Sequence, residues 1–183
     1  MLRLAAIVLI FCSVSVAEAT EAGWALLRDG GHVVLLRHAQ SPGSTEPANF
    51  DVENCATQRN LSDRGKQQAR KIGALFAARA ERTDKVLSSR YCRTRDTARL
   101  AFGDRIVEDF APLDPVVASS PEAGEQIAAV MEQIRAFTGS GNLVLVTHLE
   151  TIVALTGQQA REGEAVIVRP EGEKLHVLGR IVF

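Results

Sequence analysis

The chain lacks an excess of charge of either sign, and this sets a first limit on its partners. Its 21 Lys and Arg residues nearly balance its 22 Asp and Glu residues, which gives a formal net charge of -1 over 183 residues. Such a chain has no overall field that would gather nucleic acid or an anionic membrane, so we expect neither as a partner. Any affinity for an anion must come from local clustering of charge.

The sequence also has no internal repeat, no low-complexity tract and no apolar run long enough to cross a bilayer comfortably. Its longest apolar run, residues 4–16, follows the basic Arg3 and precedes the small-x-small pattern of residues 17–19. These are the features of a cleavable signal peptide. We therefore predict a signal peptide over residues 1–19, a mature domain over residues 20–183, and a periplasmic or secreted location. An uncleaved N-terminal anchor is the alternative.

Cysteine is scarce, and one of the three cysteines, Cys12, lies in the predicted signal peptide. Cys55 and Cys92 remain, and an even number of cysteines in an exported protein is typical of a disulfide. A Cys55–Cys92 bridge would clip the long polar loop over residues 41–60 to the segment around Arg93. Two unpaired thiols are the alternative.

What the sequence does contain is an alternation of apolar strands with amphipathic helices. Continuous apolar runs at residues 33–36 and 143–146, the latter in a strand that extends to 147, are typical of strands buried on both faces. We expect further strands at 85–89 and 105–108, a terminal hairpin of 165–168 with 175–182, and helices at 21–27, after Ser62, at 93–102, from Ser120-Pro121 and at 150–155. This order predicts an α/β three-layer sandwich, with a mostly parallel central sheet, helices on both faces and an antiparallel edge hairpin.

Four polar side chains follow the predicted strands at or just beyond their carboxyl ends. Arg37 and His38 end one strand, His148 ends another, and Arg93 follows a third. In an open α/β sheet these ends line the ligand crevice. Two imidazoles and two guanidiniums meeting there suit a phosphoryl group and predict phosphoryl transfer through a histidine. The nucleophile must be a neutral imidazole, so we expect His38 to find a backbone carbonyl for its other nitrogen.

Four segments resemble, in order, the motifs of the histidine phosphatase superfamily, which includes the cofactor-dependent phosphoglycerate mutases. They are residues 37–41 (RHAQS), 61–69, 88–98 and 144–148. The resemblance implies His38 as nucleophile, Arg37 and Arg93 as phosphate ligands, and His148 as the second pocket histidine. Ser41 falls where a family hydroxyl touches phosphate, with a simple turn residue as the alternative. The resemblance implies no metal and no cofactor for the chemistry.

The chain also departs from the family pattern. Ala39 replaces the usual glycine after the first histidine, and Arg90-Tyr91 replaces the usual Pro-Leu before the second arginine. We expect the second of these departures to change the rim of the pocket. Arg59, at the end of the long loop, either extends the pocket or faces solvent.

The proton donor for the leaving group is open between two carboxylates. Asp114 lies in the loop after a predicted strand, where many family members place an acidic residue, and we favour it because the donor needs a loop that reaches over the leaving group. Glu150, two residues past His148, is the competitor.

These features together predict a phosphomonoester hydrolase that acts on a small phosphorylated substrate through a phosphohistidine on His38. Export and the cysteine pair also resemble, more loosely, a periplasmic branch that includes lipopolysaccharide core heptose phosphatases. A sugar phosphate or lipopolysaccharide phosphate is therefore a candidate substrate, whereas the metabolites of a mutase belong to the cytosol. The alternative function is a catalytically inactive anion-binding or scaffolding relative. Oligomeric state is not indicated.

Overall fold

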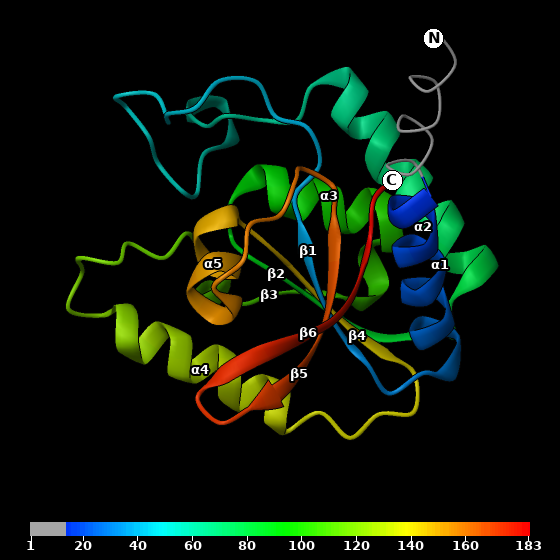
Figure 1. Ribbon diagram of the computed structural model, residues 1–183. Helices are drawn as coiled ribbons and strands as arrows, with labels where there is room; N and C mark the ends of the chain where they lie inside the picture. The colour runs from blue at the N-terminus through cyan, green and yellow to red at the C-terminus, as the bar shows by residue number, and fades with distance from the viewer. Residues whose placement is uncertain (1–13) are drawn as a thin grey trace, which may run out of the picture.

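The computed structural model describes residues 14–183, so the first 13 residues of the predicted signal peptide lie outside the described residues (Figure 1). The six strands form one sheet in the order β3-β2-β4-β1-β5-β6. Every pairing among β1 to β4 is parallel, whereas β5 pairs antiparallel with both β1 and β6. The strands are β1 (Val33–Arg37), β2 (Thr83–Ser88), β3 (Val107–Asp109), β4 (Asn142–Thr147), β5 (Ala165–Glu171) and β6 (Lys174–Ile181). The predicted fold class is confirmed.

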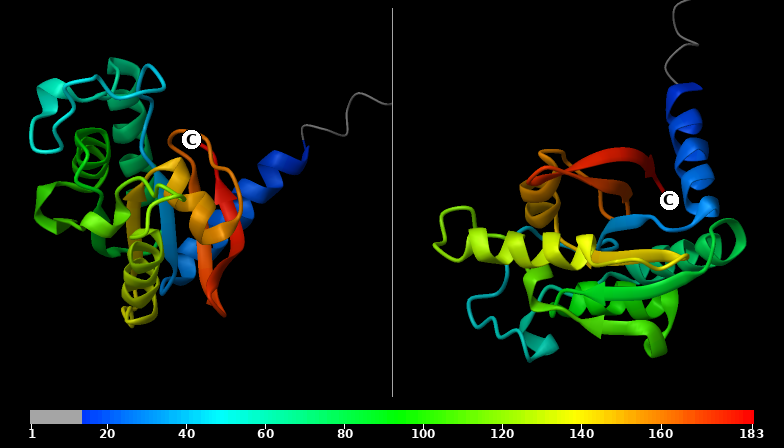
Figure 2. Two further views of the ribbon diagram at one scale, coloured as in Figure 1. Left: turned by 90° about the vertical axis from the view of Figure 1, so that its left-hand side faces the viewer. Right: turned by 90° about the horizontal axis from the view of Figure 1, so that it is seen from below.

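Helices cover both faces of this sheet (Figures 1 and 2). Alternate residues of β1 face opposite sides of the sheet. Val34 and Leu36 pack with α1, α2 and α3 on one face, whereas Val33 and Leu35 pack with α4 and α5 on the other. A strand covered on both faces must be apolar throughout, which accounts for its unbroken hydrophobic run. The helices are α1 (Val14–Asp29), α2 (Asp63–Arg79), α3 (Cys92–Phe102), α4 (Ala123–Arg135) and α5 (Leu149–Thr156).

The first helix begins earlier than the sequence predicts, at Val14, and so runs across the predicted cleavage site. Its packing nevertheless centres on Trp24 and Leu27, which are both almost completely buried. The Trp24 ring lies edge-on to Phe76 and Phe183, with centroids 5.7 and 5.8 Å away. The anchoring part of α1 therefore follows residue 19. Among residues 14–183, no helix combines the length and apolar character needed to cross a membrane.

Two predicted boundaries are wrong for local reasons. The helix expected from Ser120-Pro121 begins only at Ala123, because Ser120 forms a turn in which its Oγ accepts the N–H of Glu122. The strand expected from residue 105 begins at 107, after a short 3-10 helix over Asp104–Ile106. The start of α2 agrees with the prediction: Ser62 caps it and accepts the Gly65 N–H at 3.0 Å.

The predicted disulfide is confirmed and fixes the long loop after β1. It joins Cys55, at the start of a short 3-10 helix (Cys55–Thr57), to Cys92, the first residue of α3, across a sequence separation of 37. Closing a loop of this length restricts the unfolded chain and stabilises the fold by about 4 kcal/mol at 25 °C in the chain-entropy model. The far end of the 41–60 loop is thereby held beside Arg93.

Candidate active site

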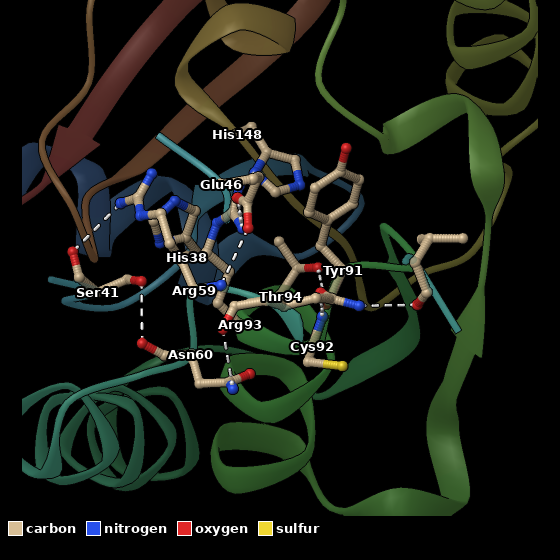
Figure 3. A network of polar contacts seen from close by, with 12 residues as sticks. His38, Ser41, Glu46, Arg59, Asn60, Tyr91, Cys92, Arg93, Thr94 and His148 are labelled. Atoms are coloured by element: carbon tan, nitrogen blue, oxygen red, sulfur yellow. Dashed lines mark hydrogen bonds and ion pairs between the residues drawn. The ribbon is translucent and has the colours of Figure 1, made fainter. Parts of the chain in front are cut away.

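The two predicted pocket histidines meet at the carboxyl edge of the sheet. His38 follows β1 and His148 follows β4, and the two strands pair in register, with Arg37 opposite Thr147. The imidazole centroids are 5.4 Å apart with planes at 61°, and both side chains are buried (Figure 3). A parallel pair of central strands thus places two rings of the same type side by side.

His38 is held in the tautomer that a nucleophile needs. Its Nδ1 lies 2.8 Å from the carbonyl oxygen of Ala39, to which it donates, so Nε2 keeps a free lone pair. Burial, the largest cause, and the charges of Arg93 and Arg37 together lower the pKa of His38 to about 3, against the opposing effect of the hydrogen bond to Ala39. The ring is therefore neutral throughout the physiological pH range.

Residues of two other matched motifs hold the segment that carries His38. The Ala39 N–H donates to Thr97 Oγ1 and the Gln40 N–H donates to Gln68 Oε1, both at 3.0 Å. Gly65 is required at the start of α2 because a Cβ there would lie only 2.1 Å from the Gln40 carbonyl oxygen. These motif residues therefore position the first histidine rather than contact a substrate.

His148 belongs to a chain of hydrogen bonds that leads away from the pocket. Arg93 Nη2 donates to His148 Nδ1 at 3.2 Å, His148 Nε2–H donates to Ser89 Oγ at 2.9 Å, and Ser89 donates to Asp114 Oδ1 at 2.9 Å. Burial first, and the charge of Arg93 next, hold the pKa of His148 well below its ordinary value. His148 is thus neutral in this arrangement, and it would become a charged donor only if a bound anion raised its pKa.

Two buried guanidinium N–H groups in this region have no protein acceptor among the described residues. Arg93 is 4% exposed; its Nη1 lies 2.6 Å from Glu46 Oε1, but its Nε is unpaired. Arg37 donates from Nη1 to the Ala160 carbonyl oxygen at 2.8 Å, and its Nε is also buried without a partner. A buried N–H without an acceptor lowers the stability of the fold unless a ligand accepts from it. The planar guanidinium group can donate two parallel hydrogen bonds to an oxyanion such as phosphate.

The loop residues Ser41 and Arg59 are mainly tied to the loop itself. The Ser41 hydroxyl donates to the Asn60 carbonyl oxygen at 3.0 Å, as a turn residue would. Arg59 donates from Nε to the carbonyl oxygen of Pro42 and from Nη2 to that of Ser41. Its charge still contributes to lowering the pKa of both pocket histidines, so Arg59 extends the positive surroundings of the site.

The predicted proton donor, Asp114, is fully engaged as an acceptor. Oδ1 accepts from Ser89 Oγ and from the Arg90 N–H, while Oδ2 accepts from Arg90 Nε and Nη2 at 2.9 and 2.6 Å. A carboxylate that accepts from four donors, two of them on one guanidinium, anchors its neighbours through both oxygens. This geometry does not support the donor role that the sequence suggested for Asp114. Glu150 is exposed in the first turn of α5.

Two residues at the pocket, Glu46 and Tyr91, were not among the predicted site residues. The Tyr91 ring centroid lies 4.9 Å from that of His148, and the Arg93 guanidinium carbon lies 4.8 Å from the same ring. Phe50 stacks on Tyr91 at 5.1 Å and so joins the loop to the pocket. The departure from the family pattern at residues 90–91 was a signal for Tyr91. Glu46 has none, because it lies in a loop without periodicity.

Within residues 14–183, no group of three or more His, Cys, Asp or Glu side chains is arranged to hold a metal ion.

Acid should destabilise the protein through His38. The pKa of His38 is about 3 in the folded protein and about 6.5 in the unfolded chain, so below pH 6.5 the unfolded chain binds a proton that the folded protein does not. The contribution of His38 to the free energy of unfolding is therefore complete above pH 6.5 and is lost as the pH falls toward 3. From pH 6.5 to about pH 4, the wild-type free energy of unfolding should fall by up to about 1.4 kcal/mol per pH unit more than that of His38→Gln. Urea unfolding at several pH values measures this difference.

The control is His176→Gln at an exposed position, which should follow the wild-type pH dependence. If the free energies of unfolding of wild type and His38→Gln fall in parallel with pH, the lowered pKa of His38 is contradicted.

Comparison with known proteins agrees with this geometry. Residues 33–114 match a model of the histidine phosphatase superfamily (branch 1), so the predicted resemblance is confirmed. No curated protein matches the chain. The fold is similar to a phosphoserine phosphatase mutant from Entamoeba histolytica, with 12% identity over 81% of this chain and 95% of the other, and a TM-score of 0.60.

Two bacterial structures are similar to the same extent. An alpha-ribazole phosphatase from Shigella flexneri has 16% identity over 80% of this chain and 94% of its own, with a TM-score of 0.58. A phosphoglycerate mutase from Thermus thermophilus has 18% identity over 83% and 99%, with a TM-score of 0.56. At these identities the likeness shows the fold alone, and the three proteins include both phosphatases and a mutase.

Proposed function

We propose that this chain, whose residues 33–114 match the histidine phosphatase superfamily, hydrolyses phosphomonoesters through a phosphohistidine on His38. The observation that carries the proposal is the state of His38: a buried, neutral ring whose Nδ1–H is taken by the Ala39 carbonyl and whose Nε2 is free. It lies beside a second imidazole and an unpaired guanidinium N–H, which suit the oxygens of a phosphoryl group.

The reaction is two displacements at phosphorus. In the first, the His38 Nε2 lone pair forms a bond to phosphorus, the ester P–O bond breaks, and a carboxylic acid protonates the leaving oxygen. In the second, water gives a proton to the carboxylate that the first step left and attacks the phosphohistidine, the P–N bond breaks, and the electron pair returns to Nε2. Arg93 and Arg37 stabilise the charge on the equatorial oxygens in both steps.

We propose further that the chain acts after export. The pattern of residues 1–19 supports a cleavable signal peptide, and the buried Trp24 and Leu27 would remain in the mature protein. Hydrolysis rather than mutase chemistry follows from this location, since phosphorylated cofactors and metabolites of a mutase belong to the cytosol. The intact mass of the exported protein should correspond to residues 20–183; a mass that still includes residues 1–19 would contradict the cleavage.

The proposed substrate is a small phosphomonoester, with a sugar phosphate or lipopolysaccharide phosphate as the candidate class. Phosphate release from a chromogenic phosphomonoester at mildly acidic pH, measured against His38→Ala, tests the function. Equal rates for the two proteins would instead favour an anion-binding relative without activity.

A further inference from the structure

A carboxylate from the long loop lies against the buried arginine of the pocket. Glu46 Oε1 is 2.6 Å from Arg93 Nη1, and its Oε2 accepts the Arg59 N–H at 2.9 Å. The side chain of Glu46 is 22% exposed while that of Arg93 is 5% exposed, so the ion pair joins a partly exposed carboxylate to a buried guanidinium. Figure 3 draws Glu46 in the same network as His38, Arg93 and His148. The carboxyl group of Glu46 is therefore open to solvent while it contacts the buried Arg93.

Several contacts outside the ion pair fix the loop that presents Glu46. The Cys55–Cys92 disulfide ties the loop to the start of α3, and Phe50 stacks on Tyr91. Gln58, which is buried, accepts the Cys92 N–H at 2.9 Å. The position of Glu46 is thus a consequence of how the loop is held against the helix that carries Arg93.

The other acidic residues near the site do not meet the needs of a proton donor. Asp114 accepts four hydrogen bonds, two of them from the Arg90 guanidinium. Glu150 is exposed on α5. Glu46 instead touches the arginine that is placed to bind the phosphoryl group, which puts it within reach of an oxygen leaving that group.

We propose that Glu46 is the catalytic proton donor of this site; this inference rests on the proposed phosphatase function. A phosphoryl dianion that takes Arg93 from Glu46 breaks the ion pair and leaves the carboxyl group beside the bound ester, where it can act as a general acid. When His38 Nε2 bonds to phosphorus and the P–O bond breaks, the Glu46 proton passes to the leaving oxygen and an alcohol departs. In the second step Glu46 takes a proton from the attacking water, which restores the acid.

The test compares two leaving groups in wild type, Glu46→Gln and Glu46→Asp. For an alkyl phosphate such as glycerol phosphate, whose alkoxide must be protonated, kcat/KM of Glu46→Gln should fall at least about 10²-fold. For p-nitrophenyl phosphate, whose leaving group needs no proton, the loss should stay below about tenfold. Glu46→Asp keeps a carboxyl group and should recover part of the alkyl rate. Because kcat/KM reports the first displacement, slow loss of the phosphohistidine does not obscure the comparison.

Exposed Glu53 on the same loop supplies the matched control, and Glu53→Gln should behave as wild type with both esters. Equal losses for both esters in Glu46→Gln would overturn the donor role. So would unchanged rates combined with tighter binding of inorganic phosphate, which would mean that Glu46 only competes with the ligand for Arg93. If wild type shows no His38-dependent hydrolysis of either ester, the phosphatase function itself fails and the donor role fails with it.

Discussion

Changing His38 to Ala should lower kcat/KM for any phosphomonoester by more than about 10⁴-fold, because the variant has no atom to carry the phosphoryl group. The structure supplies no substitute nucleophile at the same place. His148 uses both ring nitrogens, one to accept from Arg93 and the other toward Ser89. Steady-state release of inorganic phosphate measures the loss. His176→Ala, at an exposed position on β6, is the matched control and should retain full activity.

The same variant also separates covalent catalysis from simple anion binding. Rapid quenching of wild type during turnover, followed by intact-mass measurement, should reveal a protein heavier by one phosphoryl group, and acid should remove this group. His38→Ala should never show it. A phosphorylated species that persists in His38→Ala would place the covalent intermediate on another residue and contradict the proposed mechanism.

Much of the framework follows from patterns that have a direct physical cause. Burial on both faces makes β1 and β4 continuously apolar, and parallel pairing brings their carboxyl ends together, so the meeting of His38 and His148 was predictable. The disulfide was predicted from the cysteine count together with the expected export, since Cys55 and Cys92 are the two cysteines after residue 19. The backbone acceptor for His38 was expected from the tautomer that a nucleophile requires, and Ala39 provides it.

The contact between Glu46 and Arg93 was not predictable, and the reason is specific. The sequence placed Asp114 in a loop at the correct edge of the sheet but gave no information about its partners. Arg90, at one of the positions that depart from the family pattern, donates two guanidinium hydrogen bonds to Asp114 Oδ2. Glu46 reaches the pocket only because a disulfide and an aromatic stack hold its loop there. Long-range tethers of this kind leave no periodic signal around the residue that they position.

Arg93 combines more roles than any other residue described at the site, which makes its substitution the second large effect. It pairs with Glu46, donates to His148, lies against the Tyr91 ring and keeps one buried N–H without a partner. A phosphoryl group that replaced Glu46 would accept two parallel hydrogen bonds from this fork. The ammonium of a lysine would supply charge but not that geometry.

We therefore expect Arg93→Ala to lower kcat/KM by about 10³-fold and Arg93→Lys by about 10²-fold, because each removes donors that stabilise the equatorial oxygens in the transition state. Inorganic phosphate should also become a weaker competitive inhibitor in both variants. Arg99→Ala is the control: Arg99 lies on the same helix, but its side chain is 53% exposed and paired with Asp104. Unfolding curves would establish that each variant is folded. If folded Arg93→Ala stays within tenfold of wild type, the phosphoryl group does not bind at this guanidinium, and the site must be sought around Arg37 instead.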